Sequence, residues 1–354
     1  MKRNRLFLMI AAVALAVVGQ PAQSAETIKL TAVSGYAPTA LWVSVFQSHF
    51  IPEVDKKLAV KGNYKIEWNQ AWGTIAKPRG ELDAIQHGLA DIGVVQTVFH
   101  PDKLPMYSIA FVTPFTTSDI DLMSRTVNGL VAKYLQMKTV WSKYNQVLLT
   151  VLSGVDNFQI VLKSPIEKPS DLTGRKICGA GPNLRFLEGV GAIGVASTLV
   201  EWYNNIKGGI CDGTIVWPEA AANFKLYEVA PYFVNVNFGG ATSMALSFNE
   251  VRWKKLPAEV RSVLQEVAET YRKALAQKAM NDSAAGIKTY LASGGKMIAI
   301  SADERVRWAN RLPNLAQEWA AGLEKTGIPG REIVRVYMDA MKQANQPIAR
   351  DWSK

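Results

Sequence analysis

The sequence predicts an α/β fold of two lobes joined by crossing strands, and three features of the 354-residue chain lead to this prediction. Short apolar or alternating runs are followed by amphipathic stretches, an order typical of strand–helix–strand units. This order occurs once before Gln146 and again from Gln146 onward. No linker rich in Pro, Gly or Ser separates the two halves, and a long amphipathic helix is predicted from Pro257 onward.

The first half has the pattern of a parallel sheet with helices on its faces. Its strand candidates are apolar or alternating runs, and its helix candidates have apolar side chains at helical spacing. Pro52 is a potential break in the first helix. Because the connections are short, we expect a parallel arrangement. The predicted strands are 28–33, 64–68 and 90–95, and the predicted helices are 41–58 and 80–88.

The second half repeats the pattern and then becomes helical. Asp171 to Arg175 is a turn that leads into a strand ending at Cys178. A single helix is expected over residues 301–323. The other predicted strands are 146–152, 158–162 and 213–217, and the other short helices are 184–190 and 199–206.

The N-terminus has the three-part pattern of a cleavable signal peptide, which we place at residues 1–24. Lys2, Arg3 and Arg5 precede an apolar run of 13 residues, 6–18, and small residues follow near Ser24. The alternative is a membrane anchor, but the run is shorter than the ~20 apolar residues that span a bilayer. We therefore expect a protein exported to the periplasm.

Composition excludes several classes of function. Forty Lys and Arg against 30 Asp and Glu give a net charge of +10, spread along the chain, which favours attraction of anions over a nucleic-acid-binding stripe. There is no Cys/His cluster, no Gly-x-Ser-x-Gly motif and no phosphate loop or dinucleotide motif. We expect no metal or other cofactor and no enzymatic activity.

The chain has two cysteines, Cys178 at the end of one predicted strand and Cys211 just before another. If these strands are parallel neighbours, the thiols lie about 13 Å apart, beyond the ~7 Å limit for a disulfide. We therefore expect two free buried thiols. A disulfide between strands that are not neighbours is the alternative.

Candidate binding residues lie in turns that directly follow strands, because ligands of α/β folds bind at the carboxyl ends of strands. Gly179 to Arg185 is a tight turn in which Asn183 can cap a helix and Arg185 can bind a carboxylate, although Arg185 could instead face solvent. Aromatic residues in such turns can form the wall of a site or plug the core. The candidates from the other turns are Tyr36, Trp72, Gln96, Thr97 and Trp217.

Several ordered motifs resemble the substrate-binding proteins of tripartite ATP-independent periplasmic (TRAP) transporters. They include residues 88–93 (GLADIG), 100–105 (HPDKLP), 170–177 (SDLTGRKI), 209–213 (GICDG) and 225–230 (KLYEVA). The resemblance implies a two-lobed periplasmic-binding-protein-like fold with crossover strands and a long C-terminal helix. It also implies closure on a small organic acid, which the receptor delivers to two integral membrane subunits. We place lobe I at 25–155 plus 242–281 and lobe II at 156–241 plus 282–354.

The chain departs from the family pattern at the carboxylate clamp. The resemblance places Cys178 where the family has an arginine, Thr214 where a Gln-x-Asn motif begins, and Asn157 with Phe158 at a second basic position. Either Arg185 replaces the clamp or the ligand is less acidic than is usual for the family.

The aromatic candidates Trp72, Phe158 and Trp217 favour a flat or aromatic ligand. The remaining alternatives are a receptor that serves a membrane sensor and a secreted lyase or hydrolase on the same fold. The complete candidate set is Tyr36, Trp72, Gln96, Thr97, Asn157, Phe158, Cys178, Asn183, Arg185, Thr214 and Trp217.

Overall fold

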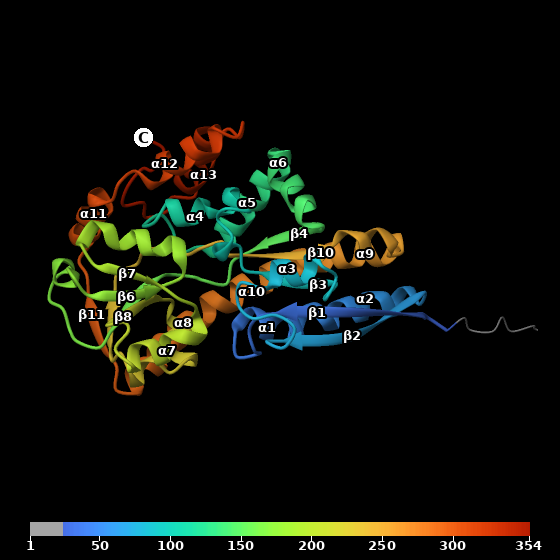
Figure 1. The fold of residues 1–354 in the computed structure, drawn as a ribbon, viewed down its shortest axis with the longest axis horizontal. Coiled ribbons are helices and arrows are strands. Elements are labelled where there is room, and N and C mark those ends of the chain that lie inside the picture. The colour runs from blue at the N-terminus through green and yellow to red at the C-terminus, as the bar shows by residue number, and fades with distance from the viewer. Residues whose placement is uncertain (1–23) are drawn as a thin grey trace, which may run out of the picture.

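Two β-sheets, each with helices packed on it, lie side by side along the long axis of the molecule (Figure 1). The computed structural model describes residues 24–354, so the expected signal peptide lies outside the described residues except for Ser24. The expected α/β fold with two lobes and a long C-terminal helix is confirmed. None of the described helices is both long enough and apolar enough to cross a membrane.

The first sheet has the strand order β2-β1-β3-β10-β4. Strands β1, β2 and β3 are parallel, as predicted, whereas β10 is antiparallel to both β3 and β4. Because Ser34 pairs with Trp72, the ends of β1 and β2 lie at the same edge of the sheet. The strands are β1 (Glu26–Ser34), β2 (Tyr64–Trp72), β3 (Ile92–Val95), β4 (Gln146–Leu152) and β10 (Met244–Asn249).

The second sheet has the order β11-β9-β5-β8-β6-β7. Strand β6 lies between β7 and β8 and is parallel to both, while β5 is antiparallel to β8 and β9. The carboxyl ends of β6 and β8 therefore lie at one edge. The strands are β5 (Gln159–Leu162), β6 (Lys176–Gly179), β7 (Ile193–Ala196), β8 (Gly213–Val216), β9 (Tyr232–Asn235) and β11 (Lys296–Ala299).

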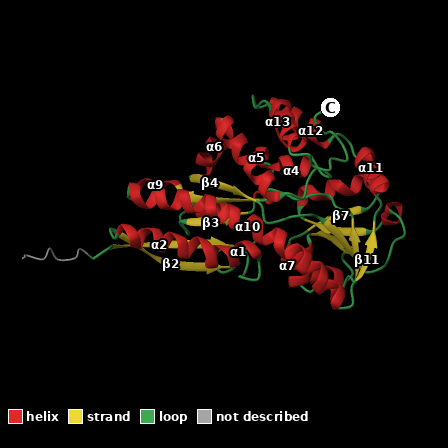
Figure 2. Ribbon diagram, turned by 180° about the vertical axis from the view of Figure 1, so that it is seen from behind, coloured by secondary structure: helices red, strands yellow, loops and turns green. Residues whose placement is uncertain are grey.

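Three segments connect the sheets. Two of them run antiparallel and are joined by a bridge between Val155 and Ala241. The third is α10 (Ala258–Ala292), a helix of 35 residues that contacts β4 of the first sheet and α8 (Pro218–Asn223) beside the second. Figure 2 shows α10 passing from one sheet to the other. The lobe boundaries expected at residues 155, 241 and 281 stay a prediction.

Three predicted elements differ from the observed ones. The helix at 41–58 continues past Pro52, because a π-helical turn (Phe46–Phe50) joins α1 (Leu41–Val45) to α2 (Ile51–Lys61) and Pro52 falls in the first turn of α2. Strand β2 extends to Trp72, which was expected in a turn. The helix expected at 301–323 is two helices, α11 (Ala302–Arg311) and α12 (Leu315–Glu324), with Pro313 between them.

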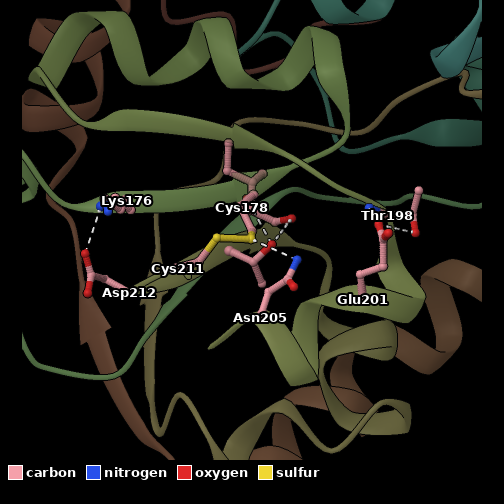
Figure 3. Close-up of a disulfide and its surroundings, with 9 residues drawn as sticks. Lys176, Cys178, Thr198, Glu201, Asn205, Cys211 and Asp212 are labelled. Atoms are coloured by element: carbon pink, nitrogen blue, oxygen red, sulfur yellow. Dashed lines mark hydrogen bonds between the residues drawn. A yellow bond between two sulfur atoms is a disulfide. The ribbon is translucent and has the colours of Figure 1, made fainter. Parts of the chain in front are cut away.

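Cys178 and Cys211 form a disulfide, so the expectation of two free thiols is wrong (Figure 3). Their Cα atoms are 5.8 Å apart, although β6 and β8 are parallel neighbours as assumed. The error lies in extending β8 backward in a straight line to Cys211. The Cys211 N–H donates to the carbonyl of Asn205 at 3.2 Å, at the end of α7 (Leu199–Lys207), so Cys211 approaches β6 from the helix that packs there.

The C-terminal helices contact the first lobe as well as the second. Helix α12 packs on α4 (Ile109–Val112), and α13 (Gly330–Gln343) packs on α5 (Ile120–Lys133). The remaining helices are α3 (Glu81–Gln86), α6 (Leu135–Thr139) and α9 (Glu250–Lys255). Shorter 3-10 segments are Thr97–Phe99, Pro105–Ser108, Val140–Tyr144, Pro169–Leu172, Gly181–Val190 and Leu226–Glu228.

Candidate ligand-binding site

An inner cavity lies between the two sheets, and most of its wall is aromatic. It receives side chains from the ends of β1, β3 and β8, from α1, α4 and α7, and from the connecting segments. Its volume of about 30 Å³ is room for only one or two water molecules. The lining residues are Tyr36, Trp42, Gln96, Val98, Phe99, Phe111, Val155, Phe158, Ala180, Leu199, Trp202, Trp217 and Ser243.

Trp217 is the centre of this aromatic wall. Its ring centroid lies 6.5 Å from Trp42, 6.2 Å from Phe158 and 6.4 Å from Trp202. Trp42 belongs to α1 and in turn contacts Tyr36 edge to face at 4.8 Å. The aromatic contacts therefore run without interruption from the first lobe to the second.

Few polar groups face the inner cavity. Gln96, only 4% exposed, has a buried Nε2 without a hydrogen-bond partner among residues 24–354. Burial raises the pKa of the Tyr36 hydroxyl, which is therefore a neutral donor at physiological pH. An unsatisfied buried amide is costly, so Gln96 marks a place where a ligand oxygen could accept a hydrogen bond from Nε2.

The turn that carries Tyr36 is held by a buried carboxyl group. The Gly35 N–H donates to Glu81 Oε1 at 3.0 Å, and the second oxygen, Oε2, has no partner. Burial raises the pKa of Glu81 to about 7. A side chain at Gly35 would collide with the backbone of Lys77 at 2.4 Å, so this turn requires glycine.

An outer cavity of about 700 Å³ adjoins the inner one and shares Val98 and Phe99 with it. Its wall includes two arginines. Arg185 forms ion pairs with Glu188 and Glu318, each at 2.8 Å, and the hydrogen bonds to these carboxylates, first of all to Glu188, raise its pKa.

The second arginine of the outer cavity, Arg79, has no carboxylate partner among residues 24–354. Its guanidinium lies 5.0 Å from the ring centroid of Phe99, in a cation–π contact. Its backbone has φ of 79°, in the left-handed region that non-glycine residues seldom adopt. Such strain is often concentrated at binding sites.

The structure brings four of the eleven candidate residues to the inner cavity, namely Tyr36, Gln96, Phe158 and Trp217. Arg185 lies at the outer cavity. Thr97 and Asn183 are buried beside the lining segments, and neither side-chain polar atom of Asn183 has a partner.

The other four candidates lie outside the wall of either cavity. Trp72 packs on Phe46 at 5.5 Å and donates to its neighbour Gln70. Cys178 is held in the disulfide, and the Thr214 hydroxyl donates to the Cys178 carbonyl within the sheet. Asn157 lines a separate cavity, described below.

Sequence reasoning missed several lining residues. Trp42 and Phe111 lie on helices, where an aromatic side chain gives no sign of whether it faces the core or a cleft. Trp202 lies on α7, and only its contact with Trp217 places it in the wall. Arg79 was not among the candidates, although the motif 76–79 (AKPR) also resembles the family, and its backbone strain and lack of an ion partner among residues 24–354 now single it out.

A family model described as bacterial extracellular solute-binding protein, family 7, matches residues 43–322. The chain belongs to this family. The match extends over both sheets and the connecting segments, and it confirms the resemblance to TRAP substrate-binding proteins. The function of this family is the binding of solutes, which agrees with a cavity formed between two lobes.

Solved structures of TRAP solute-binding proteins share the fold. One from Bordetella bronchiseptica, with bound (R)- and (S)-mandelate, is 21% identical with a TM-score of 0.80, covering 90% of this chain and 99% of that chain. One from Rhodoferax ferrireducens, with copurified benzoate, is 19% identical with a TM-score of 0.78, covering 90% and 98%. One from a marine metagenome, described as specific for aromatic acid ligands, is 21% identical with a TM-score of 0.76, covering 89% and 99%.

Proposed function

We propose that this protein is a periplasmic TRAP receptor that binds a small aromatic carboxylic acid between its two lobes. The observation that carries the proposal is the wall of the inner cavity, in which seven aromatic side chains surround a few neutral polar groups. A flat aromatic ring gains contacts on such a wall, whereas a small dicarboxylate would leave most of it unused. The solved relatives with mandelate and benzoate support this ligand class.

Binding requires the inner cavity to enlarge. A cavity of about 150 Å³ is needed to hold benzene, and the inner cavity measures about 30 Å³. We propose that the lobes, 25–155 with 242–281 and 156–241 with 282–354, separate to admit the ligand and close on it. A ligand that contacts both Tyr36 and Trp217 stabilises the closed state, since these residues lie on different lobes.

The carboxylate of the ligand is assigned to Arg79. Arg79 lies against Phe99, which belongs to both cavities, and it has no competing carboxylate among the described residues. A ligand at Arg185 would have to compete with Glu188 and Glu318. The usual clamp position, Cys178, is closed in the disulfide.

The proposal extends to export and delivery. The basic and apolar pattern of residues 1–24 supports cleavage of a signal peptide and release into the periplasm. The family supports delivery to integral membrane TRAP subunits, and co-purification of those subunits with the ligand-loaded receptor tests this step. Recovery of a membrane kinase in their place would instead assign the protein to a sensor. Incubation of the purified receptor with benzoate should leave the benzoate intact, since the proposal includes no catalysis.

Titration calorimetry with four acids tests the ligand class. Benzoate, mandelate and 3-hydroxyphenylacetate are compared with succinate, and at least one aromatic acid is expected to bind more tightly than succinate. At 100 times its dissociation constant, such a ligand would add about 2.7 kcal/mol to the stability of the receptor. Tight binding of succinate without binding of any aromatic acid would overturn the proposal.

Two matched variants test the assignment of the carboxylate. Arg79→Gln is expected to weaken binding of the tightest aromatic acid at least tenfold, because it removes a charge-assisted hydrogen bond. Arg185→Gln, at the same cavity, should change affinity less than threefold. The reverse pattern would assign the carboxylate to Arg185.

A further inference from the structure

A third cavity, of about 190 Å³ and with a polar wall, lies where the crossing segments meet the C-terminal part of the chain. We call it the polar cavity, and its wall includes Ser118, Asn157, Asn237 and Arg305. It shares no lining residue with the inner or the outer cavity. It is therefore a separate cavity from the proposed ligand site.

The guanidinium of Arg305 in this wall has an unsatisfied hydrogen-bond donor. One terminal nitrogen donates to the carbonyl of Asn237 at 3.0 Å. The Nε atom is buried and has no hydrogen-bond partner, and Arg305 forms no ion pair within residues 24–354. Burial lowers the pKa of Arg305, and no carboxylate offsets this effect. Arg305 is partly buried, and a buried N–H donor without a partner is costly, so an anion is expected beside Nε.

Two carboxylates close in sequence to the cavity wall, Glu304 and Asp119, have other partners. Glu304 forms an ion pair with Arg307. Asp119, which follows the lining residue Ser118, caps α5 by accepting the N–H of Leu122 at 2.9 Å. Neither carboxylate is paired with Arg305.

The side-chain amide of Asn237 offers a second hydrogen-bond donor beside Arg305. Asn237 Oδ1 accepts hydrogen bonds from Asn157 Nδ2 at 2.9 Å and from Gln159 Nε2 at 3.0 Å. These two bonds fix the orientation of the Asn237 amide, and they leave its Nδ2 as a donor without an acceptor among residues 24–354. The hydroxyl of Ser118, at the exposed side of the cavity, makes no hydrogen bond within the described chain.

We propose that the polar cavity binds a small oxyanion, a carboxylate or an inorganic sulfate or phosphate, through Arg305 and the Asn237 amide. A charge-assisted hydrogen bond from Nε–H would satisfy the buried donor and neutralise the guanidinium. Bound there, the anion would link α11 to both crossing segments, because Arg305 comes from α11, Asn157 from the first segment and Asn237 from the second.

Calorimetry and thermal unfolding with sulfate, phosphate and acetate test the proposal, each compared with sodium chloride at equal ionic strength. We expect a saturable rise in melting temperature with at least one oxyanion. The anion that binds most tightly shows whether the site prefers a carboxylate, a sulfate or a phosphate. Arg305→Gln should weaken that binding at least tenfold. Arg307→Gln is the matched control, because Arg307 lies on the same helix, is about half exposed and is already paired. It should bind as the natural protein does.

A crystal soaked in selenate gives a second measurement that does not depend on the folding of a variant. The expected result is an anomalous peak within hydrogen-bond distance of Arg305 Nε. Equal anion binding by Arg305→Gln and the natural protein would overturn the proposal. The proposal would also be overturned if no oxyanion gave a saturable rise in melting temperature and no selenate peak appeared at Arg305.

Discussion

The indole Nε1 of Trp217 donates a hydrogen bond to Glu219 Oε2 at 3.0 Å. The other carboxylate oxygen of Glu219 accepts from Asn223, one turn further along α8. Trp217 contacts three other aromatic residues of the inner cavity, so a buried carboxyl group orients the ring at the centre of the proposed site.

The stability of the protein should depend on the protonation of Glu219. Burial raises the pKa of Glu219 from 4.5 to about 7, and the charges of Asp282 and Asp156 add to the effect. Between these two pH values the unfolded chain loses this proton while the folded protein keeps it. The contribution of protonated Glu219 to the free energy of unfolding is therefore fully present below pH 4.5. It is lost as the pH rises to 7, by an amount on the order of 3 kcal/mol.

Urea unfolding of Glu219→Gln and the natural protein at a series of pH values checks this prediction. Between pH 4.5 and 7 the unfolding free energy of the natural protein should fall relative to that of Glu219→Gln. Above pH 7 the difference between the two proteins should be constant. Taking the difference removes the contribution of Glu81, whose pKa burial raises to about 7. A difference that does not vary with pH would contradict a raised pKa of Glu219 in the folded protein.

Replacement of Trp217 should weaken binding of benzoate, used here as the probe. Trp217→Leu removes a ring from the cavity wall, and aromatic pairs contribute about 0.5–1.5 kcal/mol beyond their buried area. We expect at least a tenfold loss of affinity by calorimetry. Trp72→Leu is the matched control, since Trp72 packs on Phe46 outside the cavity, and its affinity should stay within twofold. A larger loss in Trp72→Leu would place the ligand at the end of β2.

Removal of the disulfide should destabilise the fold. Cys178 and Cys211 are 33 residues apart, and closing a loop of this length is worth about 3–4 kcal/mol in the chain-entropy model. The double variant Cys178→Ala with Cys211→Ala should lose a free energy of this size in urea unfolding. The natural protein with a reducing agent should lose a similar amount, and an unchanged midpoint in both samples would show that the disulfide contributes nothing.

Gly286 of α10 should be required for the position of α8. A Cβ atom at Gly286 would lie 2.6 Å from the carbonyl oxygen of Pro218, the residue that follows Trp217. Gly286→Ala is therefore expected to lower the melting temperature and weaken benzoate binding. Gly322→Ala, in α12, meets no atom within 4 Å and should stabilise the protein by about 0.5–1 kcal/mol. Equal melting temperatures for the two variants would contradict the close packing at Pro218.

Strand positions could be predicted from local patterns, and relations between strands could not. The apolar or alternating segments 28–33, 90–95 and 213–217 each contain a strand, because a short segment with this pattern is buried most readily in extended form. The antiparallel insertion of β10 beside β3 joins segments about 150 residues apart, and no local pattern indicates it. Similarly, the disulfide depends on how the chain leaves α7, which spacing alone does not describe.

The amino-acid sequence by itself determined the class of the protein: the α/β elements, the two halves, the export signal expected at 1–24 and the motifs of the solute-binding family. Only the tertiary structure decided which side chains form the site. It brought Trp42 of one lobe to Trp217 of the other, left Arg79 without a carboxylate partner, and buried the Nε atom of Arg305 beside a polar cavity. The physical reason is that secondary structure follows from the period of apolar residues along a segment, whereas burial and ion pairing depend on distances between segments far apart in the chain.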